Sequence, residues 1–383
     1  MRVLHVVTLL SPDGAYGGPV RVACNQAEEL RRRGHQIVLT AAVSGADAEP
    51  AGLDVRGFPA TTAIPKVGFA GLRARGMTRW LRRHVREFDV VHVHLARDLV
   101  TLPAARIVRS AGVPLIVQTH GMIDPSDRLL ARPLDRFWTV PILRSAAAVL
   151  HLTPREATDL AAVAGPGAEL PLRELHNGVP LPAADSPGAG PDGTPEVLYL
   201  ARMHPRKRPE LFVRLAARLH AEGVAARFAM VGPDEGAADP TRQLIDSLAA
   251  PVRWEGPLPP QHTAERMARA SVYVLASVDE PYPMSVLEAM ARGLPVVVTD
   301  SCGLAPLIRE NACGIVVRSD DLDSLTAAVR ELLLQPHIRA EMGAAAARLV
   351  RDRLSMNGVA ERLEQIYREA HGVVPAGELG VRL

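Results

Sequence analysis

The stretch that decides the fold covers residues 272–299 and reads VYVLASVDEPYPMSVLEAMARGLPVVVT. It opens with one apolar run, Val272–Ala276, and closes with another, Pro295–Thr299, and both are typical of buried parallel strands. One short helix fits between them, with Glu280 in the loop before it and Glu288 inside it. Doubly wound α/β folds hold ligands at the carboxyl ends of such strands, and a helix N-terminus there suits a phosphate group. The stretch therefore predicts a site for a ligand with both phosphates and hydroxyl groups, such as a nucleotide sugar.

Strand and helix patterns alternate on both sides of this stretch and predict two doubly wound α/β domains. The chain has 383 residues, which is long for a single core. A segment rich in proline and glycine lies near the middle and is typical of a linker. We expect a first domain over residues 1–181, a linker over 182–195, a second domain over 196–355, and a final helix and tail over 356–383.

Composition excludes several classes of protein. The formal net charge is only +2, which gives no case for a nucleic-acid partner. Cys24, Cys302 and Cys313 have no disulfide or metal-site spacing, so we expect reduced thiols in a cytoplasmic protein. The apolar start, Met1–Leu10, lacks a small-residue cleavage site and predicts a first strand rather than a signal peptide. No apolar run approaches the roughly 20 residues of a membrane span.

A basic segment over residues 71–88 predicts an amphipathic surface helix. Its apolar residues can share one face, namely Leu72, Met77, Trp80, Leu81 and Val85, while arginines occupy the others. The simpler interpretation packs the apolar face on the sheet and leaves the arginines in water. The alternative is peripheral contact with an anionic membrane through Arg73–Arg86.

A basic loop follows the first expected strand of the second domain. It contains Arg202 and Lys207, and the chain uses lysine at only one other position, Lys66. A guanidinium fork and an ammonium group in one loop can grip a diphosphate. A solvated charge run that includes Arg206 and Arg208 is the alternative.

The two glutamates of the deciding stretch differ in how well a structural role explains them. Ser285 and Glu288 have the spacing of a capping box, in which the glutamate turns back to a backbone N–H group. Glu280 has no such alternative and is the better candidate for a ligand contact.

In the first domain, an apolar strand ends in Thr119-His120-Gly121, so His120 is predicted at a ligand-facing carboxyl end. A histidine on a surface loop is the alternative. His92 and His94 alternate with valines inside a strand, and we interpret them as structural because no further metal-ligand residue has suitable spacing.

Two further motifs have both a functional and a structural interpretation. Gly17 and Gly18 belong to a loop, Ser11–Pro19, between the first strand and a helix expected from Val20, and are either a ligand-approaching loop or a plain tight turn. Asp321-Leu-Asp323 has the form of a metal motif, but it begins an amphipathic helix, where aspartate is a good cap, so we predict no metal site there.

The motifs described above resemble those of a known enzyme family. Glu280-x7-Glu288, continued as far as Val298, looks like the signature of the family-4 retaining glycosyltransferases, which have the GT-B fold. Weaker similarities extend over most of the chain, at Gly17-Gly18, Thr119–Gly121, Asn177–Val179, and Arg202 with Lys207. The resemblance implies two Rossmann-like doubly wound parallel-sheet domains facing across a cleft, with a last helix that crosses back to the first domain.

The resemblance also implies roles for the residues that bind the donor. Glu280 would contact the hydroxyls of the donor sugar, and Glu288 the nucleotide ribose. Arg202 and Lys207 would hold the diphosphate, together with the N–H groups of Met284 and Ser285 after Pro283. One departure is the sequence Pro281-Tyr282-Pro283, where many members have glycine, and it stiffens this loop.

For the first domain, the resemblance implies that Gly18, with Gly17, lets its loop approach the phosphates. It implies that His120 lies near the sugar at the reacting centre. Together with Glu280, Arg202 and Lys207, His120 forms the implied catalytic set.

The implied chemistry is metal-independent transfer of a hexose or N-acetylhexosamine with retention of configuration, without a cofactor other than the nucleotide-diphosphate sugar donor. The acceptor would be a glycan, a lipid or a small metabolite, chosen by first-domain loops such as Ser44–Thr62 and Met122–Pro133. Two alternatives stay open: a nucleotide-sugar epimerase on the same scaffold, and a non-catalytic protein that binds a nucleotide sugar or a glycan.

Overall fold

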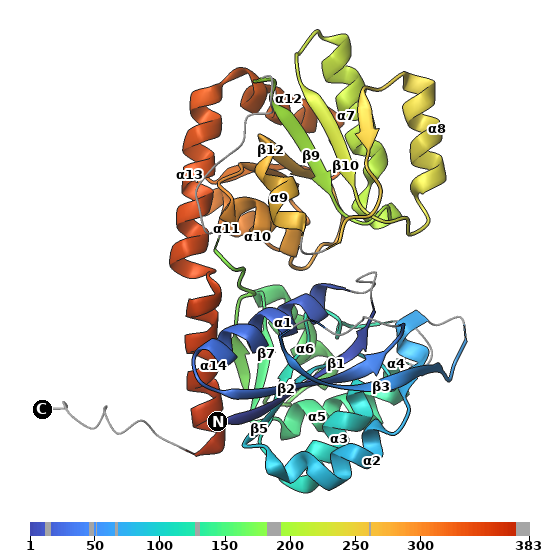
Figure 1. The fold of residues 1–383 in the computed structure, drawn as a ribbon, viewed down its shortest axis with the longest axis vertical. Helices are drawn as coiled ribbons and strands as arrows, with labels where there is room; N and C mark the ends of the chain where they lie inside the picture. Colours follow the sequence, from blue (N-terminus) through green and yellow to red (C-terminus); the bar gives the residue numbers. More distant parts are fainter. Residues whose placement is uncertain are drawn as a thin grey trace, which may run out of the picture. The chain divides into compact units, whose positions relative to one another are not determined.

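The computed structural model describes residues 1–11, 17–45, 50, 52–65, 68–126, 131–181, 193–259 and 262–372. The chain divides into two compact units (Figure 1). The first unit comprises residues 1–178 and the segment that begins at Met356, and the second comprises Val179–Ser355. Most of the expected linker, residues 182–192, lies outside the described residues.

The first unit is built on an eight-stranded sheet of order β4-β3-β2-β1-β5-β6-β7-β8. Neighbouring strands are parallel except β3 and β4, which pair antiparallel at the edge. The strands are β1 (Arg2–Leu10), β2 (Gln36–Val43), β3 (Asp54–Thr62), β4 (Leu72–Ala74), β5 (Val90–His94), β6 (Leu115–Gln118), β7 (Ala148–His151) and β8 (Leu172–Glu174).

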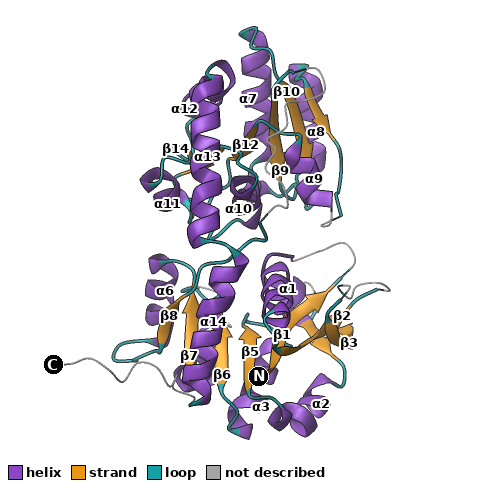
Figure 2. Ribbon diagram, turned by 60° about the vertical axis from the view of Figure 1, so that its left-hand side comes forward, coloured by secondary structure: helices purple, strands orange, loops and turns teal. Residues whose placement is uncertain are grey.

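Helices cover both faces of this sheet (Figures 1 and 2). Alternate strand residues such as Leu4 and Val91 pack on one face with α2 (Met77–His84), α3 (Thr101–Ala111), α5 (Val140–Ser145) and α6 (Pro154–Ala164). Val3 and Val90, one position away, pack on the other face with α1 (Gly17–Arg32) and α14 (Met356–His371). A further short helix, α4, covers Ala131–Leu134. This period-two division is what buries the strands on both sides.

Three expectations for the first unit are wrong in detail. Part of the expected loop Ser44–Thr62 is the strand β3, which pairs with β2. The basic segment is not one helix, because Leu72–Ala74 pairs with β3 and the helix begins only after Gly76, whose φ of 91° is left-handed. The helix expected from Val20 begins at Gly17, so both glycines lie in its first turn, where proline is also tolerated.

The second unit has a six-stranded parallel sheet of order β11-β10-β9-β12-β13-β14. Its strands are β9 (Glu196–Leu200), β10 (Arg227–Val231), β11 (Val252–Trp254), β12 (Val272–Leu275), β13 (Val296–Thr299) and β14 (Gly314–Val317). Its helices are α7 (Pro209–Ala221), α8 (Ala238–Leu248), α9 (Thr263–Ala268), α10 (Met284–Ala291), α11 (Ala305–Glu310), α12 (Leu322–Leu334) and α13 (Pro336–Arg353). The strands β12 and β13, and the short helix α10 between them, confirm the prediction for the deciding stretch.

The strand order of each sheet reverses direction at one place, which is where doubly wound folds bind ligands. In the first unit the reversal lies between β1 and β5, and in the second between β9 and β12. Both deciding strands of the sequence analysis, β12 and β13, are buried along their whole length beside the second reversal. Among the described residues, no helix combines the length and the apolar character that a membrane span needs.

Candidate functional site

The second unit brings Lys207 and Glu280 together at the carboxyl ends of β9 and β12. Lys207 ends a short 3₁₀ turn, Pro205–Lys207, after β9, and Glu280 follows β12. Nζ of Lys207 donates a hydrogen bond to Oε2 of Glu280. Their side chains are only 12% and 9% exposed, so this is a buried ion pair. The interpretation of Lys207 as part of a solvated charge run is therefore wrong.

Charge and burial act against each other at Lys207. Burial lowers the pKa of the ammonium group, and the neighbouring Glu280 carboxylate acts to raise it. Arg206 adds a second cation, with Nη2 at 3.7 Å from Oε2 of Glu280, but its side chain is 44% exposed. The carboxylate of Glu280 thus sits between a buried cation and an exposed one.

Arg202 is paired separately. Its Nη1 lies 2.8 and 2.7 Å from the two carboxylate oxygens of Glu235, a residue in the loop after β10. Glu235 was not among the residues predicted from the sequence. Its position in the sequence could have indicated it. Glu235 follows the apolar strand β10, and β10 is the parallel neighbour of β9, so the carboxyl ends of the two strands lie side by side.

The loop that carries Glu280 is fixed by its backbone. The N–H group of Gly303 donates to the Glu280 carbonyl at 2.8 Å, and Glu280 also forms a parallel bridge with Cys302. A Cβ atom at Gly303 would lie 1.7 Å from the carbonyl oxygen of Pro281, closer than any real contact. Glycine at this position is therefore required for the close approach of the two backbones.

The helix α10 begins at Met284, with Pro283 as its N-cap residue. Because Ser285 lies inside the first turn, it is not the N-cap, and the alternative interpretation of Glu288 as part of a capping box is wrong. The Ser285 hydroxyl instead accepts a hydrogen bond from the Tyr273 hydroxyl at 2.8 Å. The N–H groups of Met284 and Ser285 come before Val286, the first residue of the helix whose N–H group donates to the Pro283 carbonyl, so they are suited to an anion.

Glu288 lies one turn into α10 and is half-buried. Burial raises the pKa of the Tyr273 hydroxyl, and the charge of Glu288 adds to this effect. With capping removed as an explanation, a ligand role for Glu288 stays a prediction.

In the first unit, His120 follows β6 in a left-handed conformation, with φ of 53°, and Gly121 continues with φ of 71°. A buried carboxylate, Glu156 of α6, holds this turn. It accepts hydrogen bonds from the Thr119 hydroxyl at 2.5 Å, the Gly121 N–H group at 2.6 Å and the Leu152 N–H group at 2.7 Å. This role of Glu156 was not predicted from the sequence.

A local signal for Glu156 exists, since Thr153 and Glu156 have capping-box spacing. Thr153 is indeed the N-cap of α6 and accepts from the Glu156 N–H group. The carboxylate itself, however, turns to Leu152 and to the loop that carries His120, and the spacing does not predict that partner.

The side chain of His120 is 9% exposed, so the alternative of a surface-loop histidine is wrong. Its Nε2 lies 2.8 Å from Nδ1 of His94 at the end of β5. Burial lowers the pKa of His120 to about 3, so the ring is neutral at pH 7. His94 and His92 lie buried within β5, as expected of structural residues, but the contact of His94 with His120 was not expected.

Gly17 and Gly18 lie in the first turn of α1, after β1. The preceding residues 12–16 lie outside the described residues. Apart from its chain neighbours and the backbone of its own helix, no described atom lies within 4 Å of the Cβ position of Gly18, so packing against other elements does not explain the choice of glycine there.

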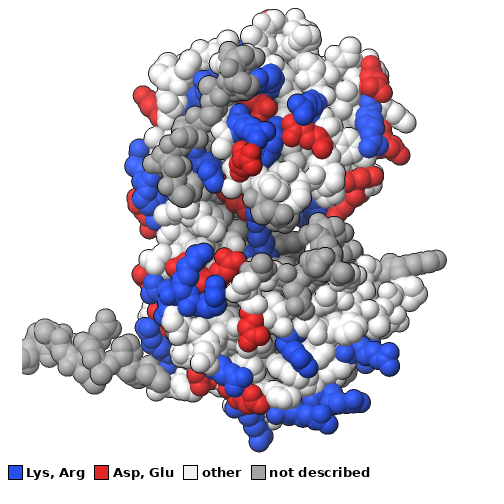
Figure 3. All heavy atoms as spheres, viewed as in Figure 1, with Lys and Arg blue, Asp and Glu red and all other residues white. Residues whose placement is uncertain are grey.

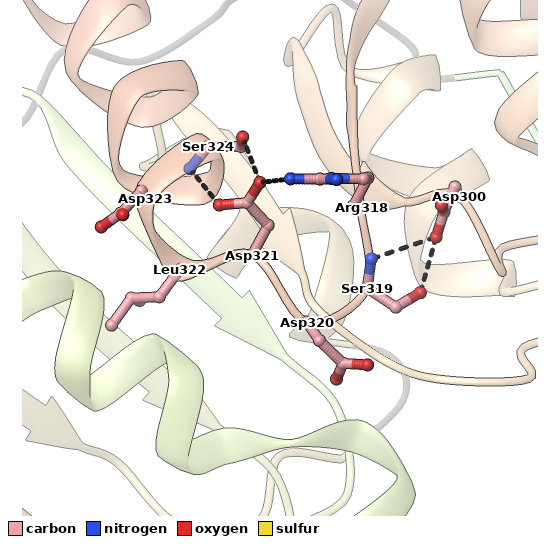
Figure 4. Close-up of a pocket in the computed structure, with 8 residues that line it drawn as sticks. All are labelled: Asp300, Arg318, Ser319, Asp320, Asp321, Leu322, Asp323 and Ser324. Atoms are coloured by element: carbon pink, nitrogen blue, oxygen red, sulfur yellow. Dashed lines mark hydrogen bonds and ion pairs between the residues drawn. The ribbon is translucent and has the colours of Figure 1, made fainter.

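The Asp321–Asp323 motif belongs to a surface hollow that also includes Asp300, Arg318 and Ser319 (Figure 4). Asp321 is the N-cap of α12, as predicted, and accepts from the Ser324 N–H group at 2.8 Å. Asp321 also pairs with Arg318, and Asp300 accepts from Ser319, so these carboxylates have structural partners (Figure 4). The three cysteines, Cys24, Cys302 and Cys313, are free thiols.

The basic segment of the first unit buries its apolar face. Met77, Leu81 and Val85 belong to the core of the unit, as the simpler interpretation predicts. Its arginines lie exposed, and Figure 3 shows basic side chains over the part of the unit that α2 forms. A surface groove beside α3 is lined by Arg82, Arg83, Arg86 and Arg106.

Two family models match consecutive parts of the chain. Residues 17–178 match the glycosyl transferase 4-like domain, and residues 185–349 match the glycosyl transferases group 1. Curated relatives include a D-inositol 3-phosphate glycosyltransferase of Thermobispora bispora, 28% identical, with 79% of this chain and 71% of the relative covered. An alpha-D-kanosaminyltransferase of Streptomyces kanamyceticus is also 28% identical, with 79% of this chain and 84% of the relative covered.

Solved structures share the fold over nearly the whole chain. HepE of Anabaena, in a complex with UDP and glucose, superposes with a TM-score of 0.75 at 16% identity, covering 96% of this chain and 100% of that one. A sucrose-phosphate synthase of Thermosynechococcus elongatus gives a TM-score of 0.77 at 17% identity, covering 98% and 100%.

Proposed function

The chain is a glycosyltransferase with the GT-B fold that uses a nucleotide-sugar donor, and we propose that it transfers a hexose or N-acetylhexosamine to an acceptor hydroxyl with retention of configuration and without a metal ion. The observation that carries the proposal is the meeting of Lys207 and Glu280 just before α10. Lys207 supplies positive charge for a diphosphate, and Glu280 can accept hydrogen bonds from sugar hydroxyls. The first N–H groups of α10 suit the same diphosphate.

In the proposed reaction, the bond between the anomeric carbon and the diphosphate oxygen breaks first and leaves an oxocarbenium-like sugar. The acceptor hydroxyl then attacks the same face, and its proton passes to the departing phosphate oxygen. Arg202 and Lys207 stabilise the negative charge that develops on the diphosphate, a type of contact that typically contributes about 2–4 kcal/mol to lowering the barrier. A protein nucleophile is not required on this scheme.

The remaining predicted residues take supporting roles in the proposal. Glu288 binds the nucleotide ribose, and the N–H groups of Met284 and Ser285 bind the diphosphate. Gly17 and Gly18 allow the start of α1 to approach the phosphates. In the first unit, His120 contacts the transferred sugar.

The names of the relatives define the first substrates to test. D-inositol 3-phosphate is a candidate acceptor, and a kanosaminyl group is a candidate for the transferred sugar. A panel of UDP, GDP, ADP and TDP sugars covers the donor base. A donor present at 100 times its dissociation constant should stabilise the protein by about 2.7 kcal/mol, so thermal shift identifies the donor before the acceptor is known.

The decisive test follows the sugar by NMR after donor and acceptor are mixed with the protein, with and without EDTA. Transfer with the anomeric configuration of the donor, at an equal rate in EDTA, supports the proposal. A product of inverted configuration would refute retention, and a loss of transfer in EDTA would refute metal independence.

Donor incubated alone separates the enzymatic alternatives. A sugar that changes configuration at a ring carbon without an acceptor would indicate an epimerase. Donor binding without turnover under every condition would indicate a non-catalytic binding protein.

We also propose peripheral contact of the first unit with anionic lipid through the exposed arginines of Arg73–Arg86. What supports it is that the apolar face of α2 is buried in the core, which leaves these cations for solvent or an anionic surface. Liposome sedimentation at low salt, with and without anionic lipid, tests it. The matched control replaces Arg82, Arg83 and Arg86 by glutamine, and equal sedimentation of both proteins would exclude the contact.

A further inference from the structure

A chain of hydrogen bonds runs through the core of the first unit from His120 to the helix α14. Nε2 of His120 lies 2.8 Å from Nδ1 of His94, and Nε2 of His94 lies 3.2 Å from Nδ1 of His5. Nε2 of His5 lies 3.3 Å from the hydroxyl oxygen of Tyr367. The same hydroxyl lies 2.7 Å from Nδ1 of His92. Each of these five side chains is at least nine-tenths buried.

The fold brings these residues together by strand periodicity. In the sheet, His5 of β1 is level with His92 of β5, and His94 is level with Gln118 of β6. All four share the face that α1 and α14 cover, since each is an even number of positions from Val3, Val90 or Ile116. Tyr367 comes from α14 at the other end of the chain.

The four histidines of this hydrogen-bond chain, His5, His92, His94 and His120, are neutral at pH 7. Burial lowers the pKa of His5 and His120 to about 3, and it lowers the pKa of His92 and His94 well below the ordinary value. A neutral imidazole has one N–H donor and one acceptor nitrogen. Each ring between two partners must therefore accept a hydrogen bond at one nitrogen and donate one from the other. All hydrogen bonds of the series thus point in the same direction, either towards His120 or away from it. The two possible directions put the proton of His120 on opposite ring nitrogens.

His92, at the end of the hydrogen-bond series opposite to His120, decides between these two directions. Nε2 of His92 is buried and has no hydrogen-bond partner within the described part of the chain. The neighbouring Gln118 acts to raise the pKa of His92, but its oxygen accepts from Gln26 at 3.1 Å and no hydrogen bond joins it to that Nε2. A buried N–H group without a partner is rarer and more costly than an unused lone pair. The proton of His92 therefore belongs on Nδ1, where it donates to the Tyr367 oxygen.

The other protons then follow in order. The Tyr367 hydroxyl donates to Nε2 of His5, His5 donates from Nδ1 to His94, and His94 donates from Nδ1 to Nε2 of His120. Nε2 of His120 is thus an acceptor, and its proton is on Nδ1. That Nδ1 forms no hydrogen bond among the described residues, but unlike Nε2 of His92 it is not shielded from solvent, so an N–H group there can reach water or a ligand.

We propose that His94, His5 and Tyr367 are positioning residues that hold His120 as the Nδ1–H tautomer, so that it presents one fixed donor to an oxygen of the bound sugar. The inference rests on the proposed function of His120 at the transferred sugar. It adds that the Tyr367 hydroxyl on α14, which is separated from His120 by the rings of His5 and His94, sets which hydrogen bond His120 can make.

A metal ion is the competing use for these rings. One ligand nitrogen each from His5, His92 and His94 can be chosen so that all lie within 4.8 Å of one another. Zinc binds imidazole nitrogen at about 2.0–2.1 Å, so its ligand nitrogens cannot be more than about 4.2 Å apart. In addition, Nδ1 of His92 is within 2.7 Å of the Tyr367 hydroxyl, and His5 and His94 bond to each other. The arrangement fits hydrogen bonding better than metal coordination.

Long-range 1H–15N correlation spectra of the full chain, labelled with 15N-histidine, test the proposal directly because they show which ring nitrogen carries the proton. We expect His120 to be protonated on Nδ1. Tyr367→Phe keeps the aromatic ring but removes the hydroxyl, and should give a mixture of both tautomers at His120. The transfer rate of this variant should fall about fivefold, the effect of one neutral hydrogen bond.

The control variant is Glu364→Gln on the same helix. Glu364 pairs with Arg33 and His35 and takes no part in the histidine chain, so its loss should lower the unfolding temperature without changing the tautomer of His120. A second pair of variants tests the middle of the chain. His94→Asn retains an N–H group near the position of Nδ1 and should keep the Nδ1–H tautomer, whereas His94→Leu should lose it.

Three results would overturn the proposal: protonation of His120 on Nε2 in the wild-type protein, an unchanged tautomer in Tyr367→Phe, or one tightly bound metal ion per chain by elemental analysis. The spectra need no substrate. Failure of the proposed function would instead appear as an unaltered transfer rate in His120→Ala, with the spectra of the wild-type protein as expected.

Discussion

Removal of the positive charge at Lys207 should destabilise the second unit and slow transfer by separate amounts. Lys207 and Glu280 form an ion pair with side chains only 12% and 9% exposed. Removing one partner of a buried pair typically costs about 3–5 kcal/mol, because the other charge stays buried without compensation. Arg206, with Nη2 at 3.7 Å from the same carboxylate, keeps part of the compensation. We therefore expect Lys207→Met to lower the free energy of unfolding by about 3 kcal/mol, the low end of that range.

Urea unfolding of the second unit can be followed through the fluorescence of Trp254, the one tryptophan of that unit. Trp80 and Trp138 are replaced by phenylalanine in every protein of the series. Glu280→Gln and the double variant complete a double-mutant cycle. Because the double variant leaves no uncompensated charge, it should regain about 0.5–3 kcal/mol relative to the sum of the single variants.

Turnover is measured on the same proteins below the unfolding transition. Loss of one contact that stabilises developing charge typically lowers kcat by about 10²–10³. The double variant should regain stability without regaining turnover. A zero coupling energy in the cycle would refute the buried ion pair. Wild-type turnover in a folded Lys207→Met protein would refute the role of Lys207 at the diphosphate.

Three further predictions follow from single contacts. Gly303→Ala would place a Cβ 1.7 Å from the Pro281 carbonyl oxygen, so it should displace the Glu280 loop and raise the KM for the donor at least tenfold, and an unchanged KM in steady-state assays would contradict this. Glu156→Gln keeps only one of the two oxygens that accept from Thr119, Gly121 and Leu152, so thermal unfolding should show a loss of about 1–3 kcal/mol per unpaired donor, and a wild-type unfolding curve would be inconsistent with these contacts. The pKa of His5 falls from 6.5 to about 3 on folding, so the unfolded chain binds this proton at higher pH than the folded one; the unfolding midpoint of the first unit should be highest above pH 6.5 and fall towards pH 3, whereas a flat profile would contradict neutral burial.

The sheets were largely predictable because a parallel strand covered on both faces is a continuous apolar run. Val272–Leu275 and Val296–Thr299 are buried at every position, and both were predicted. The strand β3, Asp54–Thr62, was not predicted because only one of its residues is fully buried, and the others are half-buried or exposed. With charged and small residues in a strand that lies next to the edge strand β4, backbone pairing rather than side-chain burial decides its structure.

The site was predictable in position but not in pairing. Lys207 and Glu280 each follow an apolar strand, and the carboxyl ends of adjacent parallel strands must meet at one edge. Which carboxylate pairs with which cation depends on side-chain reach across the sheet, so Glu235 as the partner of Arg202 was missed. Similarly, alternation in the strands places His5 and His94 on one face, but no local pattern shows that a residue near the end of the chain covers it.

The pairing changes how the diphosphate site should work. Each of the two cations predicted to hold the diphosphate, Arg202 and Lys207, already has a carboxylate partner. Such partners fix the cations in place, but they also reduce the net attraction for a ground-state donor. The first N–H groups of α10 have no acceptor within the helix, so they can contribute to binding without displacing a carboxylate. When negative charge develops on the leaving diphosphate, the side chains of the two cations can shift towards it. When the nucleotide leaves, they can form their ion pairs with Glu235 and Glu280 again. An arrangement of this kind favours the transition state over tight binding of the product, which is what turnover requires. Glu280 is the counter-charge of Lys207, and in the proposed function it would also accept hydrogen bonds from the sugar hydroxyls.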